Sequence, residues 1–240
     1  MDGRGEQVTN EDIWKLKVKL HALVWFRAAA TALFMAAFVL TVQWHDSGKD
    51  PGIVRTGAGI LVFMLSSLHV MFLGAIDQER LGSNLDGFKA TIYGSMALAA
   101  TGPFFAVSQE QLHVLVTSGL ALVILGVSEF LLARAINNLS GRLNVSKSRK
   151  WRRQEQRIEH LLWALGVFAI IGVIVLILEY PQLGAQGTLL AGAIVAGAVV
   201  CISVPTLAVA NTLLIVILVK CIERITAEDL RAAWRSKGNC

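Results

Sequence analysis

Four polar residues lie within apolar stretches of this sequence and could carry chemistry: Arg27, His69, Glu129 and Asn211. An ionisable side chain in the hydrocarbon of a membrane is costly, so its presence indicates a function or a specific partner. Glu129 is the only carboxylate away from the ends of these stretches. A lone carboxylate near a histidine is typical of a proton relay. We therefore predict that Glu129 and His69 bind a proton or a cation, with Arg27 tuning their charge.

Depth along the helices favours one common cluster of these four residues. Counted from the nearest helix end, Arg27, His69 and Glu129 lie about 8–12 Å from the inner boundary of the bilayer at the α-helical rise, and Asn211 reaches a similar depth. A structural explanation stays open beside this one. Arg27 can extend its side chain to the headgroups, Glu129 can pair with Arg27 or Arg134, and His69 can hydrogen-bond a neighbouring helix.

Cofactor and enzyme signatures are weak or missing. A haem held by two histidines needs both at one depth, and the pairs at matching depth, His21 with His160 and His45 with His113, are at the membrane boundaries. A haem-binding redox subunit is therefore only a third hypothesis. The 3 cysteines have no metal-ligand spacing. We expect no cofactor, no metal and, in the absence of any catalytic motif, no enzyme.

The composition shows which elements must position these residues. Of 240 residues, 55% are hydrophobic and only 16% are charged, and the mean hydropathy is +0.59. Soluble domains have about 25% charged residues, so this is the composition of an integral membrane protein. A crossing helix needs about 20 apolar residues. The sequence predicts an all-α bundle of about six transmembrane helices, over residues 20–44, 54–76, 90–107, 111–135, 160–180 and 187–220.

Two of the six predicted crossings are irregular. The third, 90–107, is short and contains Pro103, so it could be kinked or thin. The sixth, 187–220, is too long for one straight crossing and has Pro205 near its middle. We expect a helix that is kinked at Pro205 and projects from the membrane. A broken or re-entrant helix is the alternative.

Basic residues predict the orientation of the chain. With the N-terminus inside, 19 Lys and Arg residues fall on the inner side and 2 fall on the outer side. This bias predicts a multi-pass protein with both termini in the cytoplasm, and it fits a bacterial inner (cell) membrane best. It also explains the net charge of +5 without a nucleic-acid partner.

Three regions follow from this topology: a cytoplasmic segment 1–19, a transmembrane domain 20–220 and a cytoplasmic tail 221–240. Thr9 to Asp12 and Thr226 to Asp229 have the spacing of helix N-terminal capping boxes. Each predicts a short amphipathic helix at one end of the chain. The second of these helices has Trp234 placed to lie at the headgroups.

The inner loop 136–157 is strongly basic and also contains Leu139, Leu143 and Trp151. Such a segment can rest on anionic lipid, with each basic residue contributing about 1 kcal/mol. The alternative is that these charges only fix the topology. The candidate lipid-binding residues are Arg142, Lys147, Arg149, Lys150, Arg152 and Arg153.

Two classes of function remain. The first is permeation or transport of a proton, cation or small solute, in which Pro205 and Asn211 shape the path. The second is a non-catalytic subunit or scaffold that binds lipid or a partner protein through the basic loop and the amphipathic tail. Small residues at 192, 193, 196 and 197 allow close helix packing, either within the chain or in a homo-oligomer.

Overall fold

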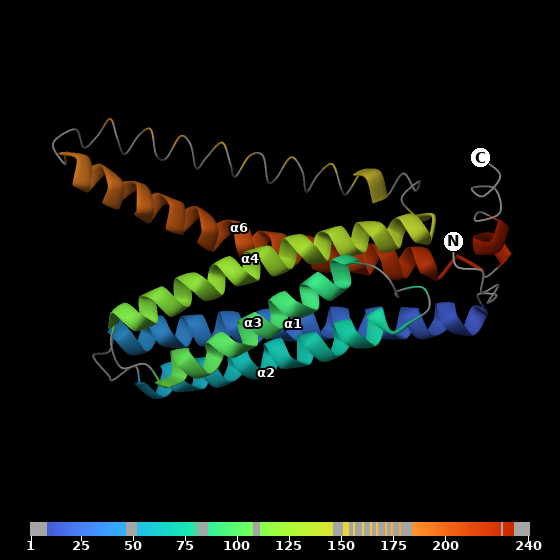
Figure 1. Cartoon of the computed structure of the whole chain (residues 1–240), viewed down its shortest axis with the longest axis horizontal. Coiled ribbons are helices and arrows are strands. Elements are labelled where there is room, and N and C mark those ends of the chain that lie inside the picture. The colour runs from blue at the N-terminus through green and yellow to red at the C-terminus, as the bar shows by residue number, and fades with distance from the viewer. Residues whose placement is uncertain are drawn as a thin grey trace.

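The computed structural model describes residues 9–46, 52–79, 81, 86–107, 111–145, 151–153, 184–226 and 228–232, together with isolated positions between 154 and 183. Over these ranges the regular structure is helical, as the sequence predicts. Figure 1 shows the long helices α1 (Asn10–Asp46), α2 (Gly52–Asp77), α3 (Asp86–Val107), α4 (Gln111–Arg142) and α6 (Gly184–Ile222). The predicted fifth crossing lies almost entirely outside the described residues, and Trp234 lies outside them.

Four described segments are long and apolar enough to cross a membrane: Gly52–Asp77, Gly87–Val107, Val116–Arg142 and Ser203–Ile222. Their outer faces are apolar, with exposed fractions of 72% for Phe104, 68% for Met71 and 65% for Phe130. Large apolar faces of this kind need a cover, and in a bilayer the lipid provides it. The chain is therefore membrane-embedded. The total of six crossings and the side of each terminus stay predictions.

The five long helices of the described part pack in a closed ring. α2 lies against α3, α3 against α4, α4 against α6, α6 against α1, and α1 against α2. Each helix therefore has two neighbours and turns one face toward a shared interior. Polar side chains on these inner faces can reach one another across the ring although they are far apart in sequence.

The contact between α2 and α3 is close enough to require glycine. A Cβ atom on Gly59 would lie 2.6 Å from the carbonyl oxygen of Gly102 and 2.7 Å from the Cβ of Ala106. Small residues allow backbones of membrane helices to approach in this way. The predicted third crossing is consequently well packed. It is also longer than expected, because α3 already begins at Asp86. The helix continues through Pro103 to Val107.

Helix α6 runs without interruption for 39 residues and contains Pro205. Figure 1 shows that the helix changes direction between its first and second halves. A proline inside a helix removes one backbone hydrogen bond and commonly bends the helix. The structure thus has the single bent helix expected from the sequence, with no break at Pro205. The side chains of the small residues at 192–197 lie outside the described residues.

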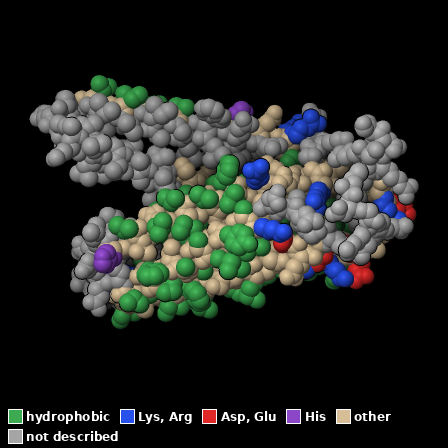
Figure 2. Space-filling view, viewed as in Figure 1, with side chains coloured by type: hydrophobic (Ala, Val, Ile, Leu, Met, Phe, Trp, Pro, Cys, Tyr) green, Lys and Arg blue, Asp and Glu red, His purple; other side chains and the backbone are tan. Residues whose placement is uncertain are grey.

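A fully buried apolar core lies at one end of the ring. It draws residues from all five long helices and from segments that follow α2, α4 and α6, among them Leu16, Leu20, Leu73, Ile76, Phe88, Ile136, Leu139, Leu218 and Ile222. Charged side chains gather at this end of the molecule (Figure 2). Lys17 Nζ lies 3.3 Å from Glu223 Oε1 here, so α1 begins where α6 ends.

Leu139, Leu143 and Trp151, the apolar residues of the basic loop, do not lie on the surface of the structure. All three belong to the buried core, and Trp151 is only 1% exposed. The reason is that α4 continues to Arg142 instead of ending near 135, so its apolar face extends through Leu139 to the core.

Among the predicted lipid-binding residues, Arg152 and Arg153 are exposed and Arg142 is partly buried. Lys147, Arg149 and Lys150 lie outside the described residues.

Both predicted capping boxes are present. Thr9 N donates to Asp12 Oδ2 at 2.8 Å, and Asp12 N donates to Thr9 Oγ1 at 3.3 Å. The same exchange joins Thr226 and Asp229, at 3.0 and 3.2 Å. The first box begins α1, which runs without a break from Asn10 into the first predicted crossing. The second begins a short helical turn over 228–232.

Candidate functional site

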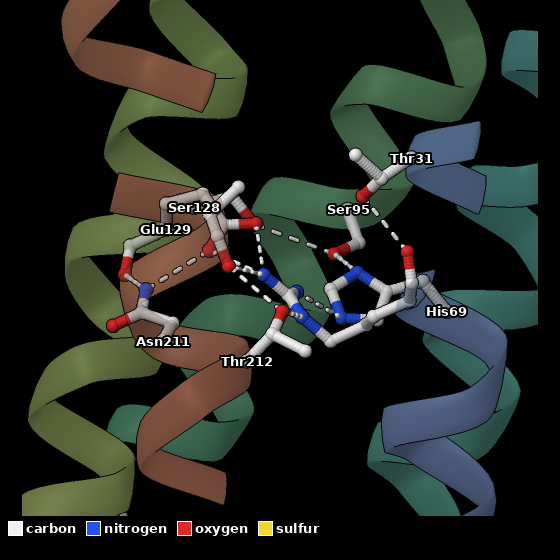
Figure 3. A network of polar contacts seen from close by, with 9 residues as sticks. Thr31, His69, Ser95, Ser128, Glu129, Asn211 and Thr212 are labelled. Carbon is white, nitrogen blue, oxygen red and sulfur yellow. Dashed lines mark hydrogen bonds and ion pairs between the residues drawn. The ribbon is translucent and has the colours of Figure 1, made fainter. Parts of the chain in front are cut away.

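Arg27, His69, Glu129 and Asn211 come together in the interior of the ring. They belong to α1, α2, α4 and α6. Figure 3 shows the side chains of His69, Glu129 and Asn211 converging with that of Ser95 from α3. All five long helices therefore contribute to one polar network. The common depth of the four residues in the sequence is what allows them to meet.

An ion pair between Arg27 and Glu129 is the centre of this network. Arg27 Nη2 donates to Glu129 Oε1 at 2.8 Å and to Oε2 at 2.7 Å. Arg27 is 6% exposed and Glu129 is 3% exposed. The partner of Glu129 is thus Arg27, whereas Arg134, the other candidate, is exposed. A buried charge needs such a partner because desolvation of an isolated ion is very unfavourable.

Three uncharged acceptors also hold the Arg27 guanidinium. Nε donates to Thr212 Oγ1 at 3.1 Å, and Nη2 donates to the carbonyl oxygen of Ala208 at 3.2 Å. Nη1 lies 3.3 Å from His69 Nε2. Arg27 is therefore directed inward and does not extend toward the headgroups. Its position is fixed from α2 and α6 as well as from α4.

Asn211 holds the Glu129 side of the pair. Its Nδ2 donates to Glu129 Oε2 at 2.9 Å and to the main-chain oxygen of Glu129 at 2.8 Å. Asn211 is 1% exposed. One side-chain amide of α6 consequently hydrogen-bonds both the Glu129 carboxylate and the backbone of α4. Pro205, the predicted kink, lies six residues earlier on α6 and is exposed.

The contacts of His69 determine its tautomer. A guanidinium can only donate, so His69 Nε2 must accept from Arg27 and carries no proton. Nδ1 then carries the proton and donates to Ser95 Oγ at 3.1 Å. The ring also stacks on Phe26, with a centroid distance of 6.1 Å. His69 is thus a neutral acceptor for Arg27, and this differs from the expectation that it binds a proton or cation itself.

Sequence reasoning missed three residues of this network: Ser95, Ser128 and Thr212. Ser95 Oγ lies 3.4 Å from Ser128 Oγ, which extends the contacts of His69 back to α4. Serine and threonine in apolar helices usually bond to their own backbone, so they carry little signal in a sequence. Their common depth with Arg27 and Glu129 is the one feature that could have identified them.

The described histidines considered for haem have no part in the polar network around Arg27 and Glu129. His21, His113 and His160 are exposed, and the side chain of His45 is outside the described residues. The His21 ring packs against Trp25 of its own helix, at a centroid distance of 6.4 Å. Among the residues that the structure describes, no group of His, Cys, Asp and Glu could hold a metal ion.

The chain matches no protein-family model, no curated protein and no solved structure.

Proposed function

We propose that this membrane protein is a small transporter in which Glu129 takes up and releases a proton. The observation that carries the proposal is the position of Glu129: its carboxylate is 3% exposed and accepts hydrogen bonds from two other helices of the ring. Intramembrane carboxylates with named partners are the usual sites of proton relays.

A proton on Glu129 changes the contacts between helices. The charged carboxylate attracts Arg27 of α1 and accepts from Asn211 of α6. The neutral acid loses the attraction to Arg27, so α1 and α6 are held less firmly against α4. A ligand shifts a conformational equilibrium only through such a difference in contacts between states. Pro205 lies six residues before Asn211 and supplies a bend at which α6 can move.

Transport is tested in proteoliposomes that contain a pH-sensitive dye. The wild-type chain should allow proton movement down an imposed pH gradient when a transported solute is present. Glu129→Gln keeps the size and shape of the side chain but cannot exchange a proton, so movement should stop. Glu228→Gln, the same change at an exposed position, is the matched control. Unchanged movement in a folded Glu129→Gln variant would contradict the assignment.

Two features support the predicted six-crossing topology. The ion pair between Lys17 and Glu223 brings the start of α1 and the end of α6 to one end of the bundle, as expected for an even number of crossings between them. Charged side chains gather at that same end (Figure 2), as the positive-inside rule predicts for a cytoplasmic face.

A non-catalytic membrane subunit or scaffold is the second candidate. The observation favouring it is that protein groups already complement the buried pair: Asn211 on the carboxylate side, and Thr212, Ala208 and His69 on the guanidinium side. Such a network can serve only to join helices. A scaffold predicts no flux under any gradient. It also predicts that a partner protein co-purifies with the full chain and is lost when residues 222–236 are removed.

A further inference from the structure

We propose that a small carboxylate anion binds Arg27 when Glu129 is protonated, so that the proton and the anion cross the membrane together. This inference rests on the transport function proposed above and names its substrate class. The position that the anion would take is the one that the carboxylate of Glu129 now occupies (Figure 3).

Arg27 keeps its charge and its place when Glu129 becomes neutral. A guanidinium is not deprotonated in proteins. Its acceptors Thr212 Oγ1, Ala208 O and His69 Nε2 are uncharged and do not depend on Glu129. They hold the guanidinium in the interior of the ring but do not neutralise it.

No other described charge faces this pair. α1 contributes Arg27, α2 contributes the neutral His69, α3 contributes Ser95, and α6 contributes Asn211 and Thr212. Protonation of Glu129 therefore leaves one uncompensated positive charge in the interior of the ring. An uncompensated buried charge is strongly unfavourable, so an anion that reaches Arg27 favours the protonated state. Binding of the proton and binding of the anion then strengthen each other by linkage.

The donors around this position match a carboxylate. Arg27 Nη2 and Asn211 Nδ2 converge on Glu129 Oε2 at 2.7 and 2.9 Å, and Arg27 Nη2 also reaches Oε1 at 2.8 Å. A planar group with two oxygens can therefore accept from both donors at the position of the Glu129 carboxylate. In the exchange one proton joins Glu129 and one carboxylate joins Arg27. The net charge of the loaded site is unchanged, so the coupled movement is electroneutral.

Pyruvate is a suitable probe because its neutral acid is scarce near neutral pH and leaks little through lipid. Liposomes holding the full chain and a pH-sensitive dye receive an inward gradient of pyruvate, with equal potassium on both sides and valinomycin clamping the potential at zero. We expect saturable acidification of the interior with one proton per labelled pyruvate. The rate should not change when a potential is imposed. Ser67→Ala, whose hydroxyl bonds only to its own helix at Phe63 O, is the matched control.

This experiment distinguishes a failure of the anion site from a failure of proton transport. Proton movement that is equally fast with pyruvate, chloride and sulfate, or that responds to the potential, overturns the anion site but leaves proton transport standing. No proton movement under any gradient overturns the transport function itself.

A binding measurement gives an independent decision. In detergent at neutral pH, pyruvate should raise the apparent Tm of Glu129→Gln by several degrees over chloride at equal ionic strength, because the neutral amide of this variant leaves Arg27 uncompensated. The wild type should respond only as the pH falls. If Glu129→Gln does not fold, the pH dependence of the wild type alone decides. A response of the wild type that does not grow toward acid pH overturns the inference.

Discussion

Arg27 on α1 and Glu129 on α4 are 102 residues apart in sequence, and Arg27 Nη2 lies within 2.8 Å of both carboxylate oxygens of Glu129. The pair reaches across the helix ring, because α1 and α4 are not neighbours in it. α1 lies between α2 and α6, and α4 lies between α3 and α6. It is therefore both the candidate site and a connection across the bundle.

Removing one member of this pair should lower the stability of the protein more than removing both. Arg27→Met leaves a buried carboxylate without a counter-charge and should lower the stability by about 3–5 kcal/mol. The double variant Arg27→Met/Glu129→Leu should recover most of that loss. The apparent midpoint of thermal unfolding in detergent measures both, with Ser67→Ala as the control. A double variant as unstable as Arg27→Met would show that charge compensation is not what the pair provides.

His69 should be neutral, with its proton on Nδ1. Arg27 Nη1 donates to Nε2, and Ser95 Oγ accepts from Nδ1 at 3.1 Å. Nitrogen-15 NMR on histidine-labelled protein can assign the tautomer once the other histidines are replaced: His21, His45, His113 and His160. Ser95→Ala should alter the Nδ1 resonance and leave Nε2 unprotonated. A proton found on Nε2 in the wild type would be incompatible with this network.

The close contact between α2 and α3 should not tolerate even one methyl group at Gly59. Its Cβ would lie 2.6 Å from Gly102 O, so Gly59→Ala should cost about 1–3 kcal/mol through overpacking. Gly57, two residues earlier, has nothing within 4 Å of an added Cβ. Gly57→Ala is therefore the matched control and should be neutral or slightly stabilising, since alanine favours helix. Equal thermal stability of the two variants would contradict the packing described for Gly59.

The capping box of the C-terminal turn should depend on pH. The Thr226 hydroxyl and then the Thr226 backbone N–H hydrogen-bond Asp229 and lower the pKa of its carboxyl from the model-peptide value of 3.8. Because the folded pKa is the lower one, the stabilisation is fully present above pH 3.8 and is lost as the pH falls through the folded value.

Amide exchange of residues 228–232, expressed as protection factors, measures this dependence. Protection should fall in acid and should also be reduced at neutral pH in Asp229→Asn. Glu228→Gln changes a neighbouring charge outside the box and should leave the protection unchanged. Protection that is independent of pH in the wild type, or equal in the two variants, would mean that the carboxylate of Asp229 does not stabilise the turn.

The membrane class, the capping boxes and the depth of the site residues were accessible from the sequence because each is a local property. Hydropathy over about 20 residues marks a crossing. The spacing from Thr226 to Asp229 defines a cap. The constant rise of an α-helix converts sequence position into depth, and it puts Arg27, His69 and Glu129 at one level whatever the neighbours of each helix are.

Which residues touch was decided only by the tertiary structure. Lipid and protein interior are similarly apolar, so a sequence pattern does not show which face of a membrane helix turns inward. The rotation of α3 and α6 places Ser95 and Thr212 in the network, and no periodicity revealed it. The rotation of α1, α2 and α4 gives Glu129 the partner Arg27 in place of Arg134. It makes His69 an acceptor for Arg27, where its residue type alone suggested a proton carrier.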